Sequence, residues 1–398
     1  MMKRGIPLLI VWIILIVFGL LAVYSVSVYE SFTTSLKLTN IFSEPTNYFY
    51  FKQQLRSLWV SLLIVIFLWK IPVSFLKNHK FAFFFMWWAF LFQLLVFLPF
   101  ESLVGDFNGA RWWIRVAWIM TIQPVEIYKL AYVFFLSSRL VRKKTEINKP
   151  WFILFFIFIC ALIYGVLLFI PDFWSVLIMG GTALLMVRFA WLTLKKTFAI
   201  FLLWLWFWVF SAFTMYLINP DLEYIQNRFS AFFVKDDSNM QTIDWQNDQA
   251  LIAIGGGGFF GQWLWRGLQK FGNIPEAQSD FIFAAFSEEI GFFWNCVLLS
   301  LYIFIFRYTI KQFAYFRDFH SKILAVGILS ILMVQTFVHI GVNIQILPNT
   351  WVTLPFISCW WTSLMVSCTE LVLLYKLIRS EDDSENLPLK NRYEKLWK

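Results

Sequence analysis

The chain has 398 residues, of which 60% are hydrophobic and 21% aromatic, whereas only 14% are charged. A soluble globular domain carries about a quarter charged residues, so this composition excludes a water-soluble fold. The net charge of +9 comes without the basic stripe and interleaved aromatic residues of a nucleic-acid-binding module, and we expect no nucleic-acid partner.

Long apolar runs separated by polar breaks predict an all-α, polytopic membrane helix bundle, because only helices of about 20 residues or closed barrels span a bilayer. Ten spans are expected, near residues 6–27, 57–76, 81–100, 123–141, 151–170, 173–193, 197–218, 281–306, 323–345 and 353–377. With both termini cytoplasmic, this threading places most Lys and Arg residues on the cytoplasmic side, as the positive-inside rule requires. The first span follows Lys3 and Arg4 without a clear cleavage site, which favours a retained helix over a cleaved signal.

Two domains are predicted: a membrane domain over 1–378, which includes a large outer loop at 219–280, and a cytoplasmic tail over 379–398. Loops of that length are usually functional or disordered. The glycines at 255–258 lack the ending of a phosphate-binding loop and follow no strand, so they indicate a flexible or re-entrant segment. The loop ends in Pro275-Glu276-Ala277-Gln278-Ser279-Asp280, which places carboxylates at the outer membrane boundary.

Ionisable residues inside predicted spans cost about 3 kcal/mol each at the helix centre, so they tend to face a partner or a cavity. Glu126 and Lys129 lie three residues apart on one helix face. They form a local ion pair near a helix start, or they line a polar cavity. Asp172 follows Pro171 at a predicted helix start, where it is an N-cap or a functional residue.

Two further groups of polar residues lie deep in predicted spans. Glu288 and Glu289 lie more than two helical turns, about 12 Å, into the eighth span, and we expect one of them to pair with a buried base or to cap a neighbouring helix. His339, with Gln335 and Asn343 four residues away on either side, is interpreted as an interhelical hydrogen-bonding residue. No spacing of His, Cys and carboxylates supports a metal site. The four cysteines lie in apolar runs and indicate neither disulfides nor a metal cluster.

Seven short segments occur in an order that resembles the SEDS family of polytopic bacterial proteins, the FtsW, RodA and SpoVE type. They are Asn108-Gly109-Ala110-Arg111 with Trp113-Ile114, Ile122-Gln123-Pro124-Val125-Glu126 with Lys129, Pro171-Asp172, Gln249-Ala250-Leu251-Ile252-Ala253-Ile254 with its glycines, Pro275 to Phe283, Glu288-Glu289-Ile290-Gly291-Phe292, and Leu347-Pro348 with Leu354-Pro355-Phe356-Ile357-Ser358. Gln269-Lys270 before the fifth segment looks more like the FtsW branch than the RodA branch.

The resemblance implies a peptidoglycan glycosyltransferase that polymerises lipid II into glycan strands at the outer face of the bacterial cytoplasmic membrane, for cell division or cell shape. It also implies a class B penicillin-binding transpeptidase as partner and Asp280 as the catalytic residue. A carboxylate there can accept a proton from the sugar hydroxyl that attacks, while cations stabilise the departing undecaprenyl diphosphate in an inverting reaction. The candidate substrate-binding residues are Arg111, Arg115, Glu126, Lys129, Asp172, Glu276 and Ser358. The sequence identifies no cofactor, although a divalent cation, Mg²⁺ or Mn²⁺, could assist the diphosphate.

Two other functions stay open on the sequence. A lipid II transporter would use Glu126 and Lys129 to line a path and would need no base. The absence of a clear inverted repeat in the sequence disfavours this alternative. A scaffold that only recruits the transpeptidase would tolerate replacement of Asp280.

Seven tryptophans stand where the resemblance places glycines: Trp174, Trp263, Trp265, Trp294, Trp351, Trp360 and Trp361. The chain has 22 Trp and only 17 Gly. Glycine serves positive φ angles or close backbone approach, and overpacking costs about 1–3 kcal/mol per site, so seven such exchanges would rival the stability of the whole protein. We hypothesise that some of these positions are UGA codons that the source organism reads as glycine.

Overall fold

The structure is a computed structural model, described here over residues 4–37, 44–98, 104–107, 110–116, 120–170, 172–218 and 243–385. In these ranges, each of the ten predicted spans corresponds to one helix. The helices are α1 (Ile6–Val26), α3 (Phe49–Lys70), α5 (His79–Leu94), α6 (Pro124–Arg142), α7 (Pro150–Leu168), α8 (Phe173–Phe189), α9 (Leu194–Ile218), α12 (Ile282–Gln312), α13 (Phe319–Asn343) and α14 (Trp361–Glu385). The predicted polytopic helix bundle is confirmed.

Eight of these helices are long and apolar enough, among the described residues, to cross a membrane by themselves. The other two are α8, an apolar helix of 17 residues, and α6, which carries Glu126, Lys129, Arg139 and Arg142. Both are largely buried within the bundle. A charged or short helix is therefore shielded from lipid by its neighbours.

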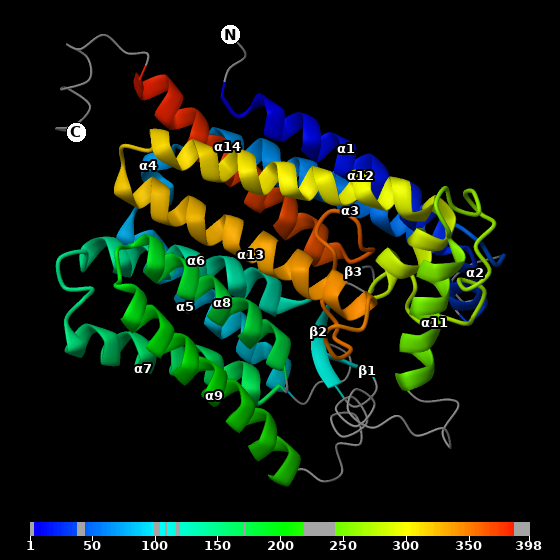
Figure 1. Cartoon of the computed structure of the whole chain (residues 1–398), viewed down its shortest axis with the longest axis horizontal. Helices are drawn as coiled ribbons and strands as arrows, with labels where there is room; N and C mark the ends of the chain where they lie inside the picture. Colours follow the sequence, from blue (N-terminus) through cyan, green and yellow to red (C-terminus); the bar gives the residue numbers. More distant parts are fainter. Residues whose placement is uncertain are drawn as a thin grey trace.

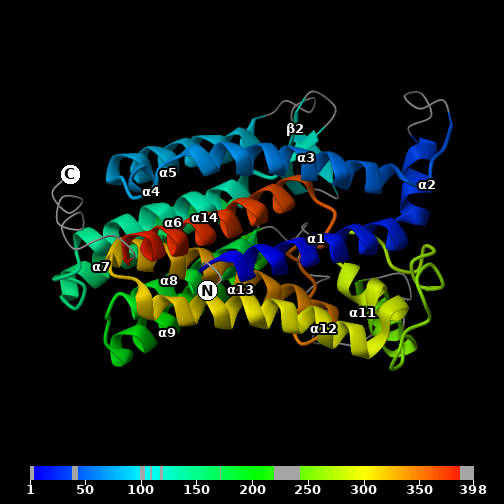
Figure 2. The ribbon, with the colours of Figure 1, turned by 90° about the horizontal axis from the view of Figure 1, so that it is seen from above.

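The helices run roughly along the long axis of the molecule (Figure 1). α1 begins and α14 ends at one end, whereas α12 begins at the other (Figures 1 and 2). At the first end, Lys77 forms an ion pair with Asp318 at 2.8 Å, and the sequence predicts both residues to be cytoplasmic. We call the opposite end the outer end. α13 and α14 form the centre of the bundle, because 78% and 89% of the residues in their apolar 18-residue stretches are buried.

Short elements connect the long helices. They are α2 (Val28–Lys37), α4 (Val73–Leu76), α11 (Ile243–Gly256), two single 3₁₀ turns at Leu95–Phe97 and Phe313–Tyr315, and the strands β1 (Val104–Phe107), β2 (Ala110–Val116) and β3 (Met120–Ile122). The strands form an antiparallel sheet in the order β1-β2-β3, with Gly105 opposite Trp113 and Arg115 opposite Thr121. This small sheet at the outer end was not predicted, because β1 and β3 have only four and three residues and β2 does not alternate strictly between apolar and polar residues.

Two predicted helix starts are wrong. α14 begins at Trp361 instead of residue 353, because Pro355 and the positive φ of Phe356, 69°, interrupt the helix in the preceding loop. α3 begins at Phe49 instead of residue 57, because its first turns are polar and extend beyond the apolar run. α14 also continues to Glu385, into the predicted tail, of which residues 386–398 lie outside the described residues.

The glycine-rich segment packs closely against α12 through backbone hydrogen bonds, so the flexible alternative of its prediction is disfavoured and the re-entrant alternative stays a prediction. Gln262 N donates to Glu288 O at 3.0 Å, and Phe292 N donates to Gly258 O at 2.9 Å. A Cβ on Gly261 would lie 2.1 Å from the carbonyl oxygen of Glu289. Gly291 has φ 73° and ψ −178°, a conformation that is essentially restricted to glycine. Glycine therefore permits close approach of two backbones here.

Tryptophan occurs at three positions whose backbone favours glycine. Trp263 and Trp265, two of the seven in the hypothesis, have φ angles of 75° and 69°. Trp191, which is not among the seven, has a φ angle of 73°. It follows α8, where its N–H donates to Arg188 O at 3.3 Å and Leu192 N donates to Val187 O at 3.1 Å. These two bonds define a Schellman motif, whose left-handed residue is usually glycine.

Candidate functional site

The backbone just before α12 is held by three hydrogen bonds. The carbonyl oxygens of residues 278–280 accept, in order, from Cys359 N at 2.9 Å, Ser358 Oγ at 2.8 Å and Asn343 Nδ2 at 2.9 Å. Asp280 is the last residue of this segment, and its side chain is buried. The catalytic candidate of the sequence analysis thus lies at the outer end on a backbone fixed from two other parts of the chain.

Asn343, at the end of α13, links this segment to the start of α12. Its Oδ1 accepts from Ala284 N at 3.0 Å, while its Nδ2 donates to Asp280 O and to His339 O. The first turn of a helix leaves backbone N–H groups without partners, and Phe281 supplies no side-chain cap to α12. Asn343 therefore caps α12 from a different helix.

Ser358 and Glu276 make contacts within the protein. The Ser358 hydroxyl accepts from Leu354 N and donates to Ser279 O, each at 2.8 Å. Glu276 Oε2 accepts from Gln278 Nε2 and Ser279 Oγ, both at 3.1 Å. The side chain of Glu276 is exposed, whereas that of Ser358 is buried. In this structure both residues shape the loop that carries Asp280, and contact with a substrate stays a prediction for each.

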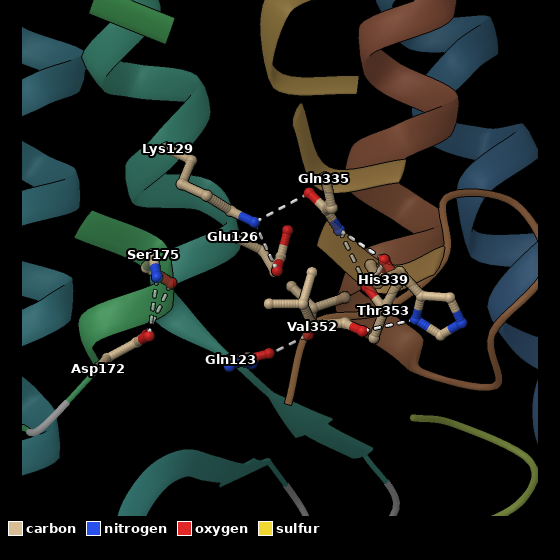
Figure 3. A network of polar contacts seen from close by, with 11 residues as sticks. Gln123, Glu126, Lys129, Asp172, Ser175, Gln335, His339, Val352 and Thr353 are labelled. Carbon is tan, nitrogen blue, oxygen red and sulfur yellow. Dashed lines mark hydrogen bonds and ion pairs between the residues drawn. The ribbon is translucent and has the colours of Figure 1, made fainter. Parts of the chain in front are cut away.

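Deeper in the bundle, five side chains form what we call the inner network: Glu126, Lys129, Gln335, Thr353 and Ser363. Figure 3 labels the first four of them. Lys129 Nζ donates to Glu126 Oε1 at 2.8 Å and to Gln335 Oε1 at 3.0 Å. Gln335 Nε2 donates to Thr353 Oγ1 at 3.0 Å, and this hydroxyl contacts Ser363 Oγ at 2.6 Å. The Glu126–Lys129 ion pair, one of the two alternatives for these residues, is confirmed, and both residues are buried.

One face of α13 joins the inner network to the backbone of Asp280. Gln335, His339 and Asn343 follow one another at intervals of four residues, so they lie on one face over about 12 Å. His339 Nδ1 contacts Val352 O at 2.7 Å in the loop before α14, so the residue takes part in a hydrogen bond, but not between two helices as predicted. No cluster of three or more His, Cys, Asp or Glu suited to a metal ion occurs among the described residues.

Asp172 caps α8, as one of its two interpretations predicted. Its Oδ1 accepts from Ser175 N at 3.0 Å and its Oδ2 from Ser175 Oγ at 2.7 Å. Figure 3 shows Asp172 and Ser175 on the opposite side of Glu126 from Gln335. The functional interpretation of Asp172 stays a prediction.

The two arginine candidates belong to the sheet. Arg115 lies on β2 opposite Thr121 and is partly buried. Arg111 also lies on β2, but its side chain lies outside the described residues, as do Asn108, Gly109 and Pro171. The sheet thus carries a cation at the same end of the bundle as Asp280.

The carboxylate pair of α12 makes the predicted contact with a buried base. Lys270 Nζ contacts Glu289 Oε1 at 2.6 Å, and Ser25 Oγ donates to the other oxygen of the same carboxylate. Glu288 accepts from the backbone N–H groups of residues 268–269, each at 3.0 Å. Through these contacts the two carboxylates hold residues 268–270 against α12, which is a structural role.

A family model described as a cell cycle protein, of the FtsW, RodA and SpoVE type, matches residues 6–383. The chain belongs to this family. It is 30% identical over 379 residues to the probable peptidoglycan glycosyltransferase FtsW of Legionella pneumophila, covering 94% of this chain and 92% of that protein. It is 29% identical to stage V sporulation protein E of Bacillus subtilis, covering 94% and 96%.

Two solved structures share the fold. A chain in a structure titled as a peptidoglycan synthase complex that coordinates polymerization and crosslinking matches with a TM-score of 0.71 and 20% identity, covering 96% of this chain and 99% of that chain. The rod shape determining protein RodA of Thermus thermophilus matches with a TM-score of 0.65 and 20% identity, covering 94% and 96%.

Sequence reasoning missed several buried polar residues of the bundle. Asn343 was noted only as a neighbour of His339, although the interval of four residues was the available signal. Lys270 was used only to choose a branch of the family. Glu370 of α14 was not considered, although a carboxylate inside a predicted span is itself a signal.

Proposed function

We propose that the chain is a peptidoglycan glycosyltransferase that polymerises lipid II at the outer face of the bacterial cytoplasmic membrane. The observation that carries the proposal is the position of Asp280, at the outer end of a membrane bundle, with its backbone held by α13 and by the loop before α14. Curated relatives named peptidoglycan glycosyltransferase support the same activity. A lipid-linked sugar explains why such an enzyme is a membrane bundle.

In the proposed reaction, the carboxylate of Asp280 accepts the proton of the acceptor sugar hydroxyl. The hydroxyl oxygen attacks the anomeric carbon of the donor, and the bond from this carbon to undecaprenyl diphosphate breaks with inversion. Arg115 and Arg111 are the proposed partners of the leaving diphosphate, because guanidinium groups match phosphate oxygens with paired hydrogen bonds. The growing glycan strand stays at the outer face.

Lys129 has a different position from the two arginines. Its ammonium group is bound by Glu126 and Gln335, about two helical turns deeper than Asn343 along α13. We therefore propose that the inner network supports the site from below, and that direct contact with the diphosphate belongs to the arginines of the sheet.

The proposed partner is a class B penicillin-binding transpeptidase. One structural neighbour comes from a peptidoglycan synthase complex whose title joins polymerization with crosslinking, which supports a crosslinking partner in general. A transpeptidase would join the strands that this chain makes.

Single-turnover polymerisation of purified lipid II in detergent, with and without the transpeptidase, tests the proposal. We expect glycan polymer that depends on this chain and grows in amount with the partner. A chain that moves lipid II across vesicles but forms no polymer would instead be a transporter. Polymer that forms equally well without this chain would leave it the role of a scaffold.

A further inference from the structure

Glu370 is a buried carboxylate of α14 outside the described contacts of the inner network. Its residue is 2% exposed, and its Oε1 has no hydrogen-bond partner among the described residues. An ionised carboxylate is costly to bury unless a cation or hydrogen-bond donors compensate it. A neighbouring cation or donor is therefore needed to compensate Glu370.

The topology places Glu370 near the depth of Lys129. Gln123 N donates to Thr362 Oγ1 at 2.9 Å, which joins the starts of α6 and α14 at the outer end. Lys129 lies about 9 Å further along α6, and Glu370 about 12 Å further along α14. Ser363, a member of the inner network, precedes Glu370 by two helical turns, so both side chains share one face of α14.

Lys129 has the capacity for one more acceptor. An ammonium group has three N–H donors, and two of those of Lys129 bind Glu126 and Gln335. The charges of Lys129 and Glu126 both act on Glu370. Among the described contacts, Lys129 thus has one carboxylate partner, Glu126, and one unused N–H donor, while Glu370 is a second carboxylate nearby.

We propose that Glu370 is a second anionic partner of Lys129, a positioning residue through which the lysine ties α14 to α6. The lysine then balances its attraction to Glu126 on its own helix against its attraction to Glu370 on the neighbouring helix. Because Lys129 also binds Gln335 of α13, its contacts would connect α6, α13 and α14 below the segment of Asp280. Its effect on catalysis rests on the proposed function, whereas its effect on stability does not.

A double-mutant cycle in purified, folded protein tests the pairing without any assay of activity. The variants are Glu370→Gln, Lys129→Gln and the double variant, with unfolding by SDS as the measurement. We expect Glu370→Gln to lower the folding equilibrium constant about tenfold more in the wild-type background than beside Lys129→Gln, since a hydrogen bond between charged groups is worth at least that factor. Equal effects in the two backgrounds would overturn the proposal.

A second background covers the case in which Lys129→Gln does not fold. Glu126→Gln leaves Glu370 as the remaining carboxylate partner of Lys129. Glu370→Gln should therefore lower the folding equilibrium constant more in that background than in wild type. An equal or smaller effect would contradict the pairing.

The kinetic readout separates positioning from a general structural role. We expect Glu370→Gln to lower kcat about tenfold with KM within about twofold, and Glu370→Asp to restore part of the rate. Glu381→Gln, a carboxylate three turns further along α14 that accepts from Arg317 N, is the matched control and should change neither constant. Unchanged kcat in Glu370→Gln would refute the catalytic effect, whereas absence of polymer from the wild type would count against the proposed function alone.

Discussion

Replacement of Trp191 by glycine should stabilise the protein, although it removes a large side chain. Trp191 has φ 73° at the left-handed position of the Schellman motif after α8. A residue other than glycine pays about 1–2 kcal/mol in this conformation. The side chain of Trp191 is 66% exposed, so its removal sacrifices little packing. We therefore expect Trp191→Gly to raise the free energy of unfolding by about 1 kcal/mol.

The matched control is Trp59→Gly in α3. Trp59 is 69% exposed, a fraction similar to that of Trp191. It lies inside a helix, however, where glycine costs about 1 kcal/mol relative to a good helix former. SDS unfolding of the purified variants measures both effects. Opposite signs are expected, and a loss of stability in Trp191→Gly similar to that in Trp59→Gly would refute the reasoning about φ.

The positive φ angles also lead to a prediction about the codons of the gene. If the source organism reads UGA as glycine, codons 191, 263 and 265 should be UGA, and peptides of the native protein should have the mass of glycine at these positions. A UGG codon at all three, together with peptides of tryptophan mass, would exclude the recoding hypothesis there.

Three further outcomes follow from the contacts. Lys270→Met should destabilise the protein by about 3–5 kcal/mol, because it leaves Glu289 buried without its base; SDS unfolding should show recovery when Glu289→Gln is added, and no recovery would contradict the pairing. Asn343→Ala should cost about 1 kcal/mol through the lost cap of α12 and should slow polymerisation of lipid II, whereas unchanged stability and rate would refute its role. Burial raises the pKa of Asp318, but its contacts with Lys77 and Ser321 outweigh burial and lower the pKa from 3.8 to about 2. The stabilisation by the ionised carboxylate is therefore present above pH 3.8 and is lost as the pH falls toward 2. Asp318→Asn should remove this part of the acid dependence of unfolding.

The spans could be predicted from the sequence because continuous apolar runs reflect the lipid environment directly. Their boundaries were less predictable where polar residues continue a helix, as at the start of α3, or where a loop is itself apolar, as before Trp361. The sheet escaped prediction because β1 and β3 are too short to show a period and the seven residues of β2 do not alternate strictly between apolar and polar.

The members of the candidate site could be named from the sequence, but their contacts could not. The spacing of Glu126 and Lys129 predicts their ion pair because both lie on one helix. The bonds from Asn343 to Asp280, from Gln335 to Lys129 and from Lys270 to Glu289 join residues far apart in the chain, and such pairs depend on how the helices pack. The depth of Glu288 and Glu289 likewise predicted a partner without identifying it.

The most direct test of the account is polymerisation of lipid II by purified Asp280→Asn beside the wild type. The matched control is Asp248→Asn on α11, an exposed carboxylate near the same end of the bundle whose contact is with Gln345. We predict that Asp280→Asn stays folded in the membrane and forms no glycan polymer, while Asp248→Asn polymerises at the wild-type rate. Polymerisation by Asp280→Asn at the wild-type rate would contradict the assignment of this carboxylate as the base.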